Sequence, residues 1–161
     1  MTRVRVIGCG NLDAGDDAAG LVAVGEARAA LEAIPGVEVV EAAMPLAVVH
    51  LLEGVDGAVV VDAVRAPRGG RAPGALVRAE AGPGGLPAAL RSSLSSHGLG
   101  IVEAVGLAAA LGETPRVVFL GIEAAEVTAG RGLSPAVQAA IPVLAGQIVA
   151  EAKALAGTVG S

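Results

Sequence analysis

The sequence predicts a three-layer α/β/α fold with a mostly parallel, twisted sheet of about five strands, one of them an antiparallel edge strand. Short apolar runs alternate with longer segments of helical periodicity, which is the order that parallel strands and their crossover helices require. The run GAVVVDAV at 57–64 is apolar almost throughout, which is typical of a strand buried on both faces of a parallel sheet. These two patterns together favour a doubly wound α/β protein.

Each element follows from a local pattern. β-branched and apolar runs bounded by Gly, Pro or charge predict strands at 3–10, 37–43, 57–64, 75–78 and 116–125. Apolar residues three or four positions apart predict helices at 16–34, 45–53, 98–113 and 134–155. Gly and Pro punctuate the excursion that contains the fourth strand, so we expect this strand at the antiparallel edge. Without a recognisable linker or repeat, we expect one domain over residues 1–161.

Composition excludes several classes of protein. The chain is 53% hydrophobic with a net charge of −5 and no Trp or Tyr, which argues against disorder and against a nucleic-acid partner. Apolar runs end before membrane-spanning length, and no signal-peptide pattern precedes the first strand. The single cysteine, Cys9, fits a reducing compartment. We therefore expect a cytoplasmic monomer without membrane insertion.

Acidic residues stand where a Gly-rich loop usually binds phosphate. The stretch GCGNLDAGDDAAG contains Asp13, Asp16 and Asp17, which would repel an anion. Ligands of open α/β sheets bind beyond the carboxyl ends of the strands. Asp17 follows the first strand, Asp62 terminates the third, and His97 begins the helix that leads to the last strand, so all three should meet at that edge. Two carboxylates and an imidazole form a donor set for a divalent metal of borderline softness.

Four motifs carry a resemblance to a known family. VIGCGNLDAGDDAAG, VVVDAV, SSHGLG and GLSPAVQAAIP follow one another in the order and spacing of the hydrogenase maturation proteases, which the sequence resembles over nearly its whole length. The resemblance implies a nickel-dependent endopeptidase that removes the C-terminal extension of a [NiFe]-hydrogenase large-subunit precursor. It also implies that Asp17, Asp62 and His97 are the catalytic, metal-contacting residues. Nickel would arrive with the substrate, and another divalent cation would be able to bind in vitro.

Other interpretations stay open beside this one. The turn 42–45 differs from the Gly-Gly-Thr-like turn usual in the family, so a non-catalytic, metal-sensing module that binds a hydrogenase precursor is an alternative. An autonomous metallohydrolase that keeps its own ion is another. We expect Asp13 and Asp16 to cap the first helix and complement its dipole. We expect packing or surface roles for the remaining polar candidates: Cys9, His50, Glu103 and Glu123.

Overall fold

Five strands form a single sheet in the computed structural model of the chain, which describes residues 2–66, 70–92, 94 and 100–159. The strands are β1 (Val4–Cys9), β2 (Val37–Ala42), β3 (Gly57–Val64), β4 (Leu76–Glu80) and β5 (Arg116–Glu123). Their order is β2-β1-β3-β5-β4; β4 runs antiparallel to β5, and the other neighbours are parallel. The expected fold class, including the antiparallel edge strand, is confirmed.

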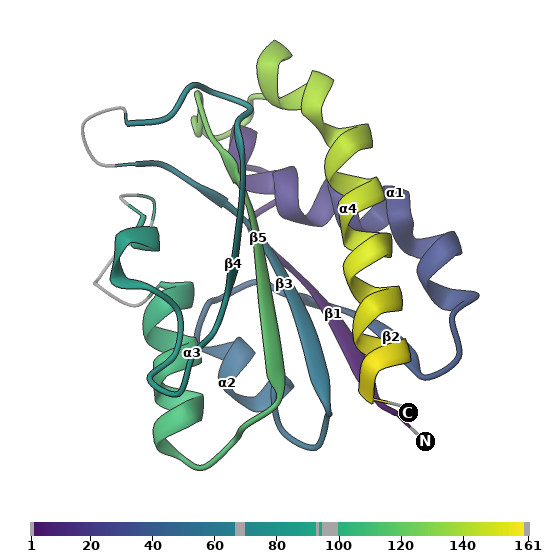
Figure 1. Cartoon of the computed structure of the whole chain (residues 1–161). Helices are drawn as coiled ribbons and strands as arrows, with labels where there is room; N and C mark the ends of the chain where they lie inside the picture. The colour runs from purple at the N-terminus through teal and green to yellow at the C-terminus, as the bar shows by residue number, and fades with distance from the viewer. Residues whose placement is uncertain (1, 67–69, 93, 95–99, 160–161) are drawn as a thin grey trace.

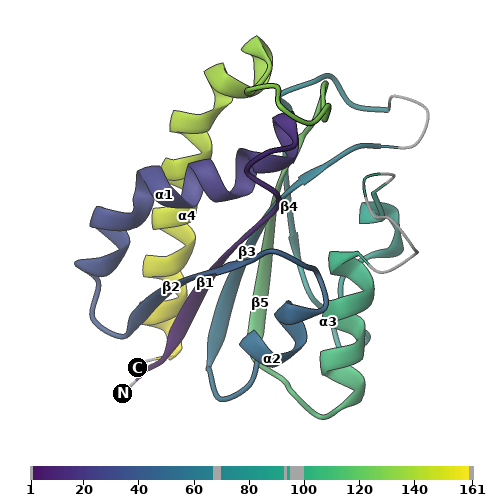
Figure 2. The same ribbon diagram turned by 180° about the vertical axis from the view of Figure 1, so that it is seen from behind.

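Helices cover both faces of this sheet. They are α1 (Ala19–Glu32), α2 (Ala47–Leu51), α3 (Ile101–Ala110) and α4 (Pro135–Val159), with short 3-10 helices η1 (Gly15–Ala18) and η3 (Ala88–Leu90). α1 and α4 lie on one face, and α2 and α3 lie on the other (Figures 1 and 2). The carboxyl ends of the parallel strands therefore meet at one edge, between the two helical layers.

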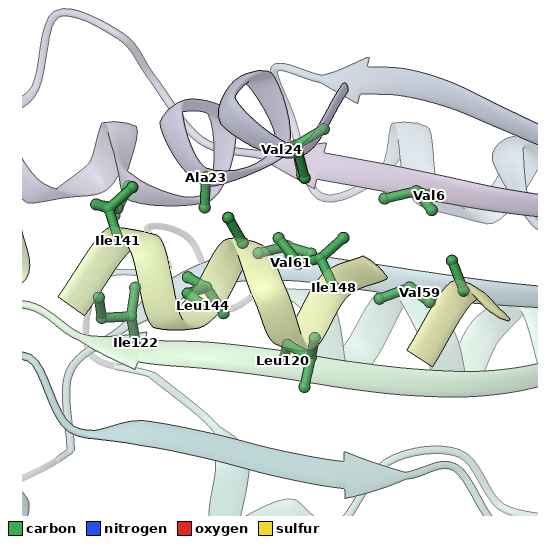
Figure 3. Close-up of a cluster of buried hydrophobic side chains, with 14 of the residues drawn as sticks. Val6, Ala23, Val24, Val59, Val61, Leu120, Ile122, Ile141, Leu144 and Ile148 are labelled. Atoms are coloured by element: carbon green, nitrogen blue, oxygen red, sulfur yellow. The ribbon is translucent and has the colours of Figure 1, made fainter. Parts of the chain in front are cut away.

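The central strands are apolar because helices bury them on both sides. Val59 and Val61 of β3 face α1 and α4, whereas Val60 belongs to a second cluster with α2 and α3. In Figure 3 the side chains of Ile141, Leu144 and Ile148 lie among those of α1 and the sheet. Complete burial of each such side chain contributes about 1.5–3 kcal/mol, which makes the sheet a rigid platform for the loops at its edge.

α4 is the longest of the described helices and is rich in apolar residues. Its segment Pro135–Gly157 is long and apolar enough to cross a membrane by length and composition. Its stripe of buried residues nevertheless packs into the core against α1 and the sheet: Val137, Ile141, Leu144, Ile148, Ala152 and Leu155. The apolar residues of this stripe are therefore accounted for by their place in the core.

Gly20 allows α1 to begin directly against the sheet. A Cβ atom at this position would lie 2.6 Å from the backbone oxygens of both Cys9 and Val61. No side chain fits there, so a glycine is required by close approach. The contact fixes η1, which immediately precedes α1, over the carboxyl ends of β1 and β3.

Candidate active site

A cavity of ≈ 340 Å³ opens at the carboxyl ends of β1, β2 and β3. Its lining comes from the loop after β1, the turn after β2, the end of β3, and the segment around Ser92 and Leu94. Asp17 and Asp62 both line it. Residues separated by 45 positions in the chain thus share one cavity because β1 and β3 are adjacent parallel strands.

Asp62 lies within β3, with its carboxyl half-buried at the cavity. Its Oδ1 accepts a hydrogen bond of 2.9 Å from the backbone N–H of Ala63. Burial first, and the negative charge of Asp17 second, raise the pKa of Asp62 to about 8. At neutral pH the free protein therefore holds a proton on this carboxyl for most of the time.

Asp17 projects from η1 and is also half-buried. Burial raises the pKa of its carboxyl, and hydrogen bonding from the Asn11 backbone partly offsets that rise. The loop closes tightly around this residue, since the backbone N–H of Asn11 donates to the Asp17 carbonyl at 3.3 Å. Gly10, at φ 142°, has no Cβ that would collide with the same carbonyl oxygen.

Asp17 and Asp62 fit a cation chemically. Each carboxyl has a raised pKa in the free protein, and the charge of Asp17 contributes to the rise at Asp62, so a bound divalent ion would relieve the repulsion. His97, the third residue expected here, lies outside the described residues. Among the residues that the structure describes, no three His, Cys, Asp or Glu side chains are grouped to hold a metal ion.

Cys9 ends β1 and also lines the cavity, but its thiol is buried, with 2% of the residue exposed. Burial first, and then the charges of Asp62 and Asp17, raise the pKa of the thiol well above its ordinary value. A thiol held in its neutral form is a poor nucleophile. The expected packing role of Cys9 is confirmed by its burial.

Neither Asp13 nor Asp16 caps a helix, so the capping prediction is wrong, although Asp16 does lie in the first turn of η1. Residue Ala14 is the N-cap of η1 and makes no side-chain capping bond, and Asp16 is completely buried. Its Oδ2 accepts hydrogen bonds from the N–H groups of Ala125 and Glu126 and from the Ser134 hydroxyl, and its Oδ1 accepts one from the Ser134 N–H. Burial alone would raise the pKa of Asp16, but these donors hold it below its ordinary value.

The acids expected at surfaces also have specific partners. Glu123, expected as a strand-end charge, is 2% exposed; its carboxylate accepts from the Ala66 N–H at 2.8 Å and pairs with the Arg71 guanidinium at 2.9 Å. Glu103 accepts from the Gly100 N–H at 3.0 Å and so helps to cap α3. His50 is exposed, as expected, and contacts Glu53.

Comparison with known proteins decides the family. The family model described as HycI, hydrogenase maturation protease, matches residues 22–151. The chain belongs to the hydrogenase maturation protease family. This family consists of hydrolases, and its matched range includes Asp62 and His97 but begins after Asp17. No curated protein gives a significant match.

Solved structures of hydrogenase maturation proteases share this fold. HybD from Escherichia coli has a TM-score of 0.75 at 24% identity, with 94% of this chain and 93% of that chain covered. HycI from Thermococcus kodakarensis KOD1 gives 0.72 at 24% identity, again with 94% and 93% covered. The solution structure of HycI from Escherichia coli gives 0.67 at 18% identity, with 93% and 90% covered. These similarities show that the fold extends over nearly the whole chain.

Proposed function

We propose that this hydrogenase maturation protease is a nickel-dependent endopeptidase that removes the C-terminal extension of a [NiFe]-hydrogenase large-subunit precursor. The observation that supports it is the pair of half-buried carboxyls, Asp17 and Asp62, lining one cavity at the carboxyl edge of the sheet. In this proposal Asp17, Asp62 and His97 contact nickel that the precursor carries. The reaction takes place in the cytoplasm, and the protease acts as a monomer.

Carboxylates and an imidazole are suited to recognise a metal ion that must remain bound to the precursor. They bind nickel less tightly than thiolates do, so such a cavity can contact a thiolate-bound ion in the precursor without extracting it. Contact with the ion would favour the charged forms of Asp17 and Asp62 and release the proton that Asp62 otherwise holds. A precursor without nickel lacks this interaction and should bind poorly.

The test is cleavage of purified precursor, with and without nickel. The wild-type protease should shorten only the nickel-loaded precursor. Asp17→Asn, Asp62→Asn and His97→Ala should each reduce the rate about 100-fold or more, because each removes a metal contact. His50→Ala and Asp13→Asn are matched controls: both side chains are exposed, and both variants should cleave at the wild-type rate. Wild-type rates in the Asp62 and His97 variants would reject the assigned roles.

A second function is favoured by the turn after β2. Residues 42–46 line the cavity, and residues 42–45 are the segment that departs from the usual Gly-Gly-Thr-like turn. A chain altered there can instead be a binding module that holds the precursor without cutting it. The same assay separates the two functions, since a stable complex with an intact precursor tail supports the module and release of a shortened precursor excludes it.

A further inference from the structure

Two neighbouring aspartates on η1 point to different surroundings. Successive side chains of a 3-10 helix are about 120° apart, so Asp16 and Asp17 cannot both face the cavity. Asp17 lines the cavity, whereas Asp16 is completely buried beneath the loop that joins β5 to α4. The position of the Asp17 side chain therefore depends on the contacts that hold Asp16.

Asp16 joins the first loop to that distant loop through a closed set of contacts. The carboxylate accepts four hydrogen bonds of 2.7–2.8 Å, two from Ala125 and Glu126 and two from Ser134, the residue directly before α4. The Asp16 N–H in turn donates to the Glu126 carbonyl at 2.6 Å. Gly15, at φ 55°, also approaches the Glu126 backbone too closely to carry a Cβ. These contacts clamp η1 between the sheet and the start of α4.

We propose that Asp16 is a positioning residue, which sets the place of the Asp17 carboxylate in the cavity through this clamp. The activity readout of the proposal depends on the function proposed above, whereas its structural readout does not. A carboxylate is needed because the four hydrogen bonds that the described residues make to this side chain are all donated to it. An asparagine amide would place its own N–H₂ against a donor in either orientation.

The first experiment compares cleavage by three variants with the wild type, each measured well below its unfolding temperature. Asp16→Asn should lower kcat about 100-fold with little change in KM, because misplacement of a catalytic group by about 1 Å has that effect. Ser134→Ala, which removes one of four donors, should show a smaller loss in the same direction. Leu155→Ala is the control: it opens a cavity in the core beside Gly57, at the other end of β3, and should keep the wild-type kcat.

The second experiment measures loop order without substrate. In the wild type, ¹⁵N order parameters of the amides from Asn11 to Asp17 should be near 0.85, and in Asp16→Asn they should fall below about 0.6 while those of β1 and β3 stay unchanged. Ser134→Ala provides the same comparison if Asp16→Asn does not fold. The proposal would be overturned if the order parameters of the amides from Asn11 to Asp17 were unchanged in the folded variants. It would also be overturned if Asp16→Asn lowered kcat no more than Leu155→Ala does. If the wild type leaves the nickel-loaded precursor intact, the proposed function fails, and the order parameters alone decide the role of Asp16.

Discussion

Asp62→Asn should make the protein more stable at neutral pH, although it removes a proposed catalytic residue. The raised pKa of Asp62 means that the folded state disfavours the charged carboxylate. Asparagine has nearly the same shape, carries no charge, and keeps an oxygen to accept the Ala63 N–H at 2.9 Å. The substitution therefore removes the cost of the charge and leaves the local hydrogen bond in place.

The magnitude follows from the pKa in the two states. The carboxyl titrates near 3.8 when unfolded and near 8 when folded, so the unfolded chain loses this proton first as the pH rises. Stability conferred by Asp62 is then present below pH 4 and is lost between pH 4 and 8, at about 1.4 kcal/mol per pH unit. By pH 7 the loss reaches about 4 kcal/mol, and because water reaches the half-buried side chain we expect about 2–4 kcal/mol.

Urea denaturation in the presence of a chelator, at intervals from pH 4.5 to 8, measures this directly. The difference in the free energy of unfolding between the wild type and Asp62→Asn should be smallest at pH 4.5, about 1 kcal/mol or less, and should widen as the pH rises. Asp13→Asn, which changes an exposed carboxylate in the loop after β1, should stay within about 0.5 kcal/mol of the wild type throughout. An Asp62→Asn variant no more stable than the wild type at pH 7.5 would refute the reasoning, because the carboxylate would then be ionised and well stabilised.

Three further predictions concern the frame of the cavity. Gly20→Ala should destabilise the fold by at least about 3 kcal/mol, because its Cβ would collide with the backbone oxygens of Cys9 and Val61. Gly25→Ala, on the exposed side of the same helix with open space around it, should stabilise the fold by about 1 kcal/mol. Equal denaturation midpoints for the two variants would contradict the close approach of α1 to the sheet at Gly20. Glu123→Gln should cost about 2–3 kcal/mol in urea denaturation, because Arg71 loses its buried partner, and a change below about 0.5 kcal/mol would argue against the pair. Cys9 should resist iodoacetamide at pH 8 until the protein is unfolded, and rapid labelling of the native protein would show that the thiol is accessible.

The fold was predictable because its signals are local. The continuous apolar run of β3 sets both of its ends, and the observed strand is Gly57–Val64, as expected from 57–64. Helix boundaries were less accurate: the segment expected at 45–53 is helical only over Ala47–Leu51, because the residues at both of its ends form turns instead. The general rule for parallel sheets then placed Asp17 and Asp62 at one edge, where both line the cavity.

Contacts between distant loops were not predictable in this way. Asp16 has the local pattern of a helix cap, and only the folded chain brings Ala125 and Ser134 to it. Arg71 lies in a Gly/Pro-rich segment that resembles a solvated loop, yet it pairs with Glu123, 52 positions away. One signal was available for Asp16, because it is followed directly by Asp17 on a helical turn. Two consecutive side chains on such a turn point in different directions, so if Asp17 faces a ligand, Asp16 must face something else.

The clamp at Asp16 also has a consequence for biosynthesis. Its partners follow it by 109 to 118 residues, so a ribosome must synthesise the chain through Ser134 before the loop after β1 can acquire its final shape. Contacts of such long range form late and slow the folding reaction. A nascent chain would thus be unable to close the clamp around Asp16 until the segment through Ser134 has left the ribosome, which makes the final shape of the loop after β1 a late product of folding.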